Sequence, residues 1–146
     1  MIDSMELPEL FISRARAVAA RVSVAADEAA VERIVAEERR RGGDDKVGVA
    51  RAARGIAETG TCVVETDDEE TRLATMLPET SVIILRTKDI VPRVGDVAGY
   101  LRDRQKDGNV SYTSFITGPS RTADIERVGA VGVHGPLEVH IILVEG

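Results

Sequence analysis

The strongest structural signal in the sequence is a pair of uninterrupted apolar runs, Val82-Ile83-Ile84-Leu85 and Ile141-Ile142-Leu143-Val144. A strand with one solvated face alternates apolar and polar residues, whereas these runs are apolar at every position. Such runs are typical of strands that are buried on both faces, as in a parallel sheet that helices cover. We therefore predict that both segments are strands of such a sheet.

Outward from these runs, strands and helices are predicted to alternate along the chain. Five segments rich in β-branched residues are candidate strands: Lys46–Val49, Thr61–Glu65, Ser81–Arg86, Ser111–Thr117 and Val139–Val144. The helices predicted between them cover Arg51–Glu58, Glu69–Leu77 and Asp96–Arg104. This alternation predicts the α/β class, in a single three-layer domain with a mainly parallel sheet flanked by helices.

Two more helices are predicted ahead of the first strand. Apolar residues recur at helical spacing over Leu7–Val22. The second helix follows Asp27, a predicted N-cap, and ends with Arg39–Arg41 before Gly42-Gly43, as capping and the helix dipole favour. Residues 1–45 are thus a helical N-terminal part and residues 46–146 an α/β core, and we expect one domain overall.

Composition and charge exclude several classes of protein. The chain has 146 residues, 43% of them apolar, which is enough for one domain with a real core. It contains 19 Lys plus Arg and 25 Asp plus Glu, and the resulting net charge of −6 argues against a nucleic-acid-binding protein. No apolar run approaches the ~18 residues of a membrane span, and acidic residues stand where a signal peptide has basic ones. We expect a cytoplasmic protein.

The single Cys and two His leave little for metal or redox chemistry. One Cys makes neither an internal disulfide nor an iron–sulfur cluster that needs about four thiolates, and Cys62 is predicted to be a buried apolar residue. We find no metal-ligand spacing. A hydrolase triad has no support either, since no Gly-x-Ser-x-Gly elbow exists and no Cys neighbours His134, while His140 is interpreted as a structural residue of the last strand.

Three loops are the candidate functional site, because each is small, polar and Gly-containing and adjoins a predicted strand. They cover Ile56–Thr61, Thr117–Glu126 and Gly132–Pro136. In open α/β sheets, loops at the carboxyl ends of strands line the ligand crevice.

The second loop has two interpretations that stay open. It precedes a helix predicted to begin near Ala123, so its free N–H groups, with the side chains of Ser120, Arg121 and Thr122, would hold a carboxylate or phosphate. Alternatively, Ser120 or Thr122 simply caps that helix, and the acidic residues that follow favour its dipole.

The first loop is equally ambiguous. Gly60 is predicted to be the C-cap of a helix, directly before the strand that begins at Thr61. Glu58 is then either a base or nucleophile or an ordinary surface residue.

Four segments, in this order, resemble the lactate utilization protein C family. They are Gly55–Thr61, Arg72–Pro78, Phe115–Glu126 and Gly132–Pro136, and the resemblance runs from about Lys46 to the C-terminus. It implies a LUD domain with a fold similar to the glucosamine-phosphate deaminase, ribose-phosphate isomerase and CoA-transferase group. It also implies a role beside two iron–sulfur partner proteins in oxidising L-lactate to pyruvate, with the clusters in those partners and no cofactor or metal in this chain.

Our first hypothesis is a subunit that assists this oxidation and binds a small anionic ligand. The expected ligand-binding residues are Glu58, Thr59, Gly60, Thr61, Arg72, Gly118, Pro119, Ser120, Arg121, Thr122, His134 and Gly135. Candidate catalytic residues are Glu58, Asp124 and His134. The alternatives are a free-standing enzyme with sugar-phosphate isomerase or CoA-transferase-like chemistry, and an interaction scaffold.

The N-terminal part before the Ala-Glu-Thr-Gly-Thr motif is shorter than in fuller members of the family that the chain resembles. A missing strand or helix would leave a sheet edge open, and a second copy would cover it. We therefore predict a homo-oligomer.

Overall fold

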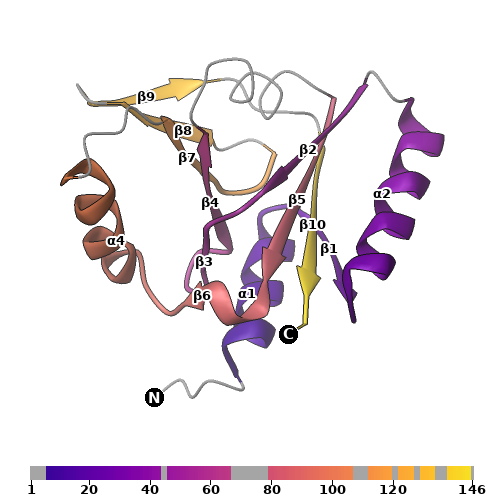
Figure 1. Cartoon of the computed structure of the whole chain (residues 1–146), viewed down its shortest axis with the longest axis horizontal. Coiled ribbons are helices and arrows are strands. Elements are labelled where there is room, and N and C mark those ends of the chain that lie inside the picture. Colours follow the sequence, from indigo (N-terminus) through magenta and orange to yellow (C-terminus); the bar gives the residue numbers. More distant parts are fainter. Residues whose placement is uncertain are drawn as a thin grey trace.

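A computed structural model describes residues 6–43, 46–66, 79–106, 112–119, 122–126, 129–133 and 138–145. Its first sheet, sheet A, is entirely parallel and has β5 and β10 at its centre (Figure 1). In spatial order it contains β1 (Arg21–Ala25), β10 (Glu138–Val144), β5 (Thr80–Arg86) and β2 (Val47–Arg51). The two uninterrupted apolar runs lie in β5 and β10, so the prediction of an α/β fold with a parallel sheet is confirmed.

A second sheet, sheet B, was not predicted. In spatial order it contains β6 (Ile90–Val91), β3 (Arg54–Ile56), β4 (Thr61–Thr66), β7 (Tyr112–Ile116), β8 (Thr122–Glu126) and β9 (Gly129–Val133). All neighbours are antiparallel except β3 and β6. The five predicted strands correspond to β2, β4, β5, β7 and β10.

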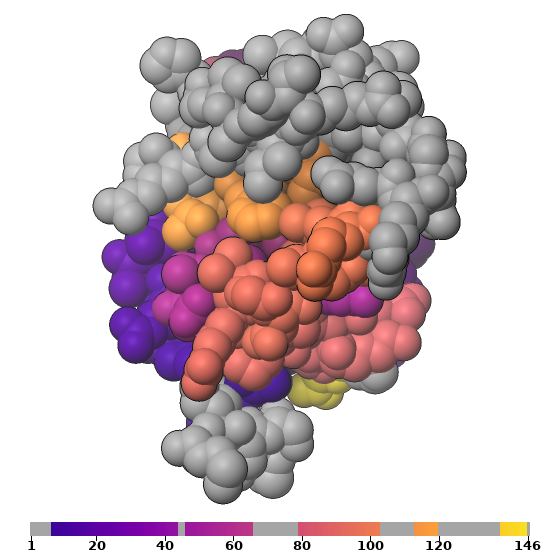
Figure 2. All heavy atoms as spheres, turned by 90° about the vertical axis from the view of Figure 1, so that its left-hand side faces the viewer, coloured from indigo at the N-terminus to yellow at the C-terminus, as the bar shows by residue number. Residues whose placement is uncertain are grey.

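The sheets face each other, and a helix covers the outer face of each (Figure 1). Helix α2 (Glu28–Gly42) packs on sheet A, and α4 (Gly95–Lys106) packs on sheet B, where it lies across the outer surface of the molecule (Figure 2). Helix α1 (Glu6–Ala17) contributes to the core between the sheets. A short 3₁₀ helix, Thr87–Asp89, connects β5 to β6.

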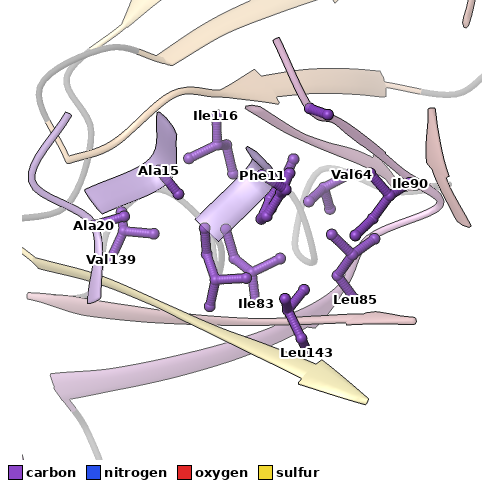
Figure 3. Packing of buried hydrophobic residues seen from close by; sticks show 13 residues of the cluster. Phe11, Ala15, Ala20, Val64, Ile83, Leu85, Ile90, Ile116, Val139 and Leu143 are labelled. Carbon is purple, nitrogen blue, oxygen red and sulfur yellow. The ribbon is translucent and has the colours of Figure 1, made fainter. Parts of the chain in front are cut away.

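The main hydrophobic core lies between the two sheets, with Phe11 of α1 near its centre (Figure 3). Ile83 and Leu85 of sheet A and Ile116 of sheet B are buried in the same cluster. Burying one such side chain contributes roughly 1.5–3 kcal/mol, so this cluster is a major reason why the two sheets pack together.

Helix α2 begins and ends where local chemistry predicts. The Asp27 carboxylate accepts a hydrogen bond of 2.8 Å from the N–H of Ala30 and so caps the first turn. At the other end Gly43 has a φ of +94° and donates its N–H to the carbonyl of Arg39 at 2.8 Å. The predicted N-cap and the glycine after the helix are therefore confirmed.

The first predicted helix is too long. Helix α1 ends at Ala17, Ala19 has a φ of +74°, and the chain then forms strand β1. Val22 fits the helical spacing, but it is β-branched and favours a strand, and the parallel pairing of β1 with β10 places it in one.

A helix over Arg51–Glu58 is also wrong, because this segment crosses from one sheet to the other. The N–H of Ala52 donates to Ile84 of sheet A, and the N–H of Ala53 donates to Val63 of sheet B, each at 2.8 Å. Non-local hydrogen bonds thus override the helical preference of this alanine-rich stretch. The helix predicted over residues 69–77 lies outside the described residues.

Candidate functional site

The three candidate loops leave sheet B at the same end. Cys62 at the start of β4 is paired with Ile116 at the end of β7, and Ile116 is paired with Thr122 at the start of β8. Thr122 is in turn paired with Val133 at the end of β9. This row of four backbone positions brings together the residues from which all three loops extend.

A chain of threonine hydroxyls joins the first two loops. The Oγ1 atom of Thr61 lies 2.7 Å from that of Thr59 and 2.7 Å from that of Thr117. Thr61 is buried while Thr59 is exposed, so the chain of hydrogen bonds runs from the interior to the surface. These hydroxyls lie on the face of sheet B that α4 covers, since Val63 and Phe115, two residues along on the same face, pack against α4.

Glycines 60 and 118 give these two loops their shape. Both have a φ of +68°, a left-handed conformation that glycine adopts without strain. A Cβ atom on Gly60 would lie 2.3 Å from the N of Ala15, and one on Gly118 would lie 2.1 Å from the carbonyl O of Val18. Both glycines therefore allow the end of α1 to approach the loops closely. Gly60 lies in the turn between β3 and β4, so the prediction that it ends a helix is wrong.

Glu58 is exposed, and its carboxylate already has a partner. Its Oε1 accepts a hydrogen bond of 3.0 Å from the N–H of Val94, just before α4, and its own N–H donates to Pro92 at 3.1 Å. These bonds fix the turn between β3 and β4 to the segment that leads into α4.

The predicted helix near Ala123 is wrong, since Thr122–Glu126 forms strand β8. The pairing of β8 with both β7 and β9 provides hydrogen bonds that a single helical turn at this place would forgo. The loop before Thr122 thus connects two antiparallel strands, and neither helix capping nor a helix dipole acts there. In this strand the backbone of Asp124 is paired with Ser114 and Val131.

Of the remaining expected site residues, Pro119 follows Gly118 and is partly buried. Arg72, Ser120, Arg121, His134 and Gly135 lie outside the described residues, as do the side chains of Thr122 and Asp124.

A second polar cluster, on sheet A, was missed by the sequence analysis. His140 of β10 is buried, and both of its ring nitrogens have partners: Nδ1 lies 2.6 Å from Oε1 of Glu38, and Nε2 lies 2.7 Å from Oγ of Ser23. His140 is therefore a satisfied residue of the last strand, as predicted. No local sequence pattern indicates these partners, because Glu38 and Ser23 lie 102 and 117 residues away from His140 in the sequence.

Two arginines complete this cluster around the buried carboxylate of Glu38. Arg21 Nη1 lies 2.6 Å and Arg41 Nη2 lies 3.1 Å from its oxygens. Burial alone would raise the pKa of Glu38, but the hydrogen bonds and charges of Arg21 and His140 outweigh it and lower this pKa to about 2. Burial lowers the pKa of His140, against the opposing effect of Glu38. At neutral pH the cluster thus contains an ionised Glu38 and an uncharged His140.

Cys62 is fully buried, and desolvation raises its pKa to about 12. Its predicted role as a small apolar core residue is confirmed. Within the described ranges, no three His, Cys, Asp or Glu side chains are grouped so that they could hold a metal ion. Across the same residues, no helix is long and apolar enough to cross a membrane.

Comparison with known proteins places this arrangement in a family. Lactate utilization protein C of Geobacillus thermodenitrificans (strain NG80-2) is 40% identical over 100 residues, which cover 67% of this chain and 42% of that protein. The uncharacterized protein YkgG of Escherichia coli (strain K12) is 41% identical over 102 residues, covering 68% of this chain and 44% of that protein. The chain therefore spans less than half the length of these curated relatives.

The fold also has a counterpart among solved structures. A crystal structure of a DUF162 family protein from Deinococcus radiodurans matches it with a TM-score of 0.67 at 17% identity, over 99% of each chain. Residues 36–144 match the LUD domain, so the segments that form β2 to β10 are those of a known family. The chain belongs to the LUD domain family.

Proposed function

We propose that this chain acts in the cytoplasm as a lactate utilization protein C-like subunit, which assists the oxidation of L-lactate to pyruvate. The proposal rests on the family match and on the name of its Geobacillus relative. The electron transfer takes place in iron–sulfur partner proteins, because the one cysteine of this chain is buried and a cluster needs about four thiolates.

The contribution of this subunit is to bind a small anionic ligand at the end of sheet B. The single observation that supports it is the row from Cys62 to Val133, from which the three loops extend. The two hydrogen bonds that join Thr59, Thr61 and Thr117 use two of their three hydroxyl hydrogens, so this chain offers one remaining donor to a ligand. Arg121, in the second loop, supplies the positive charge that pairs with a carboxylate or phosphate.

The ligand is tested by isothermal titration of the whole chain with L-lactate, pyruvate and inorganic phosphate in turn. We expect one of the three to bind, and Arg121→Gln to weaken it by about 10- to 100-fold, the effect of losing one charge-assisted hydrogen bond. Arg102→Gln, on the exposed surface of α4, is the matched control and should leave the affinity unchanged. Absence of binding for all three probes would contradict the anion site.

Two amide variants separate binding from catalysis. A binding subunit tolerates Glu58→Gln and Asp124→Asn with its affinity intact. An enzyme with sugar-phosphate isomerase or CoA-transferase-like chemistry would bind its substrate and lose turnover in one of them.

The lactate role is tested in the host organism. Deletion of the gene for this chain should abolish growth on L-lactate and leave growth on pyruvate unchanged, and the gene supplied in trans should restore it. Equal growth of the deletion strain on both carbon sources would refute the role.

We further propose that the chain forms a homo-oligomer through an edge of sheet A. β1 is an edge strand of this sheet, and its residue Val24 is 54% exposed. An open strand edge beside an exposed apolar side chain favours pairing with a second copy. Light scattering at micromolar concentration should give the mass of an oligomer, and a monomer mass would contradict this proposal.

A further inference from the structure

A groove between sheet A and α2 contains a second group of reactive side chains, on the opposite side of the molecule from α4 (Figure 1). Its volume is about 520 Å³, within the usual range for small-molecule sites. Ser23 and His140 line it together with Glu38, so the polar cluster on sheet A is accessible from this groove.

The three side chains have the order of contacts that nucleophilic catalysis requires. The Ser23 hydroxyl lies 2.7 Å from Nε2 of His140, and Nδ1 of the same ring lies 2.6 Å from the Glu38 carboxylate. A nucleophile, a base and a carboxylate that orients the base are related in this way in hydrolases of unrelated folds.

The chemistry of the partners fixes the direction of both hydrogen bonds. Glu38 is ionised and surrounded by donors, so it only accepts hydrogen bonds. Nδ1 of the neutral His140 ring therefore carries the hydrogen and donates it to Glu38. Nε2 is then free to accept the hydrogen of the Ser23 hydroxyl, as a general base must.

We propose that Ser23, His140 and Glu38 form an esterase-type acyl-transfer site that accepts small esters. Ser23 Oγ attacks the acyl carbon while its proton moves to Nε2 of His140. The bond from this carbon to the alcohol oxygen then breaks, and the proton passes to the departing alcohol. Water next attacks the acyl-serine, gives a proton to Nε2, and releases the carboxylic acid as the Oγ–carbon bond breaks and Ser23 regains its proton.

The charges of the groove indicate which esters fit best. Arg21, Arg33 and Arg41 line it against two glutamates, Glu37 and Glu38. Arg21 and Arg41 already contact Glu38 and also lie 3.6 and 3.8 Å from the carboxylate of Glu138. Arg33 has no ion pair among the described residues, so its charge favours an ester that carries a carboxylate on its acyl part over a neutral one. Mono-p-nitrophenyl terephthalate, whose para carboxylate cannot reach its own ester carbonyl, should therefore be hydrolysed faster than p-nitrophenyl benzoate.

The site is tested by reacting the whole folded chain with a fluorophosphonate, which phosphonylates activated serines. We expect the mass of one adduct per chain and, after digestion, the modified peptide to contain Ser23. Ser23→Ala should lose the adduct and the hydrolysis of p-nitrophenyl acetate, and His140→Gln should slow both by about 100-fold. Ser13→Ala, on the exposed face of α1, is the matched control and should react like the unmodified chain.

The wild-type chain alone is sufficient to refute the site. An adduct on another serine, or no adduct while circular dichroism shows a folded chain, would overturn the proposal even if a variant fails to fold. Equal rates for p-nitrophenyl benzoate and mono-p-nitrophenyl terephthalate would overturn the preference for a negatively charged ester.

Discussion

Nδ1 of His140 lies 2.6 Å from Oε1 of Glu38, and this contact connects strand β10 to helix α2 across 102 residues of sequence. The same carboxylate accepts from Arg21 of β1 and Arg41 of α2. Glu38 is thus the polar centre through which α2 is fixed to sheet A. Burying such a carboxylate costs free energy. Removing its charge costs more, because the arginines and the histidine beside it then lose their negatively charged partner.

Glu38→Gln should therefore destabilise the protein strongly. An amide cannot balance the charge of Arg21, so we expect a loss of about 3 kcal/mol, or a Tm lower by roughly 10 °C. Thermal unfolding followed by circular dichroism measures this. The control is Glu37→Gln. The Glu37 carboxylate is exposed and pairs with Arg40 at 2.8 Å, so its loss should cost less than about 0.5 kcal/mol. Similar losses for the two variants would contradict the central role of Glu38.

The stability of the protein should fall in two steps as the pH decreases. The pKa of His140 is lower in the folded state, so the unfolded chain takes up a proton first and stability falls as the pH drops below the usual histidine range near 6.5. The pKa of Glu38 is lowered from 4.5 to about 2, so a further loss occurs between these two values. Urea unfolding at a series of pH values detects both steps.

His140→Gln should remove the upper of these two steps, and His134→Gln should keep it. If His134→Gln removes the upper step and His140→Gln keeps it, the assignment of this step to His140 is refuted.

Thr61→Val should cost about 1–2 kcal/mol, because it leaves the Thr117 hydroxyl without its buried partner. Thr61→Ser keeps the hydroxyl and should recover much of this loss. The control, Thr59→Val, changes the exposed end of the same hydrogen-bonded chain and should shift the free energy of unfolding by less than about 0.5 kcal/mol. Urea unfolding compares the three variants.

Alanine at Gly60 or Gly118 should destabilise the chain by at least about 2 kcal/mol. Each position has a positive φ, and a Cβ atom there would collide with the backbone of Ala15 or Val18. Gly99→Ala is a control with the opposite sign, since it adds a methyl group in open space on α4 and should stabilise by up to about 1 kcal/mol. Loss of stability in all three variants would show that close approach to α1 is not the cause.

The Cys62 thiol should not react with Ellman's reagent in the native protein. It is fully buried and its pKa is raised to about 12, so the thiolate that attacks the reagent is absent. In concentrated guanidinium chloride we expect one thiol per chain to react at the ordinary rate. Fast reaction without denaturant would mean that the core around Cys62 opens readily.

Local features of the sequence were enough to predict the parts of the fold that depend on neighbouring residues. The apolar runs in β5 and β10 predicted the parallel sheet, and Asp27 predicted the start of α2. Capping, and the burial of a strand on both faces, leave their signal within a few residues of the place where they act.

Strand pairing and the polar clusters were decided only when distant segments met. Val22 lies in a strand because β10 is beside it, and Ala123 lies in a strand because β7 and β9 flank it. For the same reason, no short pattern predicts that Thr61 meets Thr117 or that His140 meets both Glu38 and Ser23. Helical propensity differs by less than about 1 kcal/mol for most residues, so the hydrogen bonds and buried area of a completed sheet outweigh it.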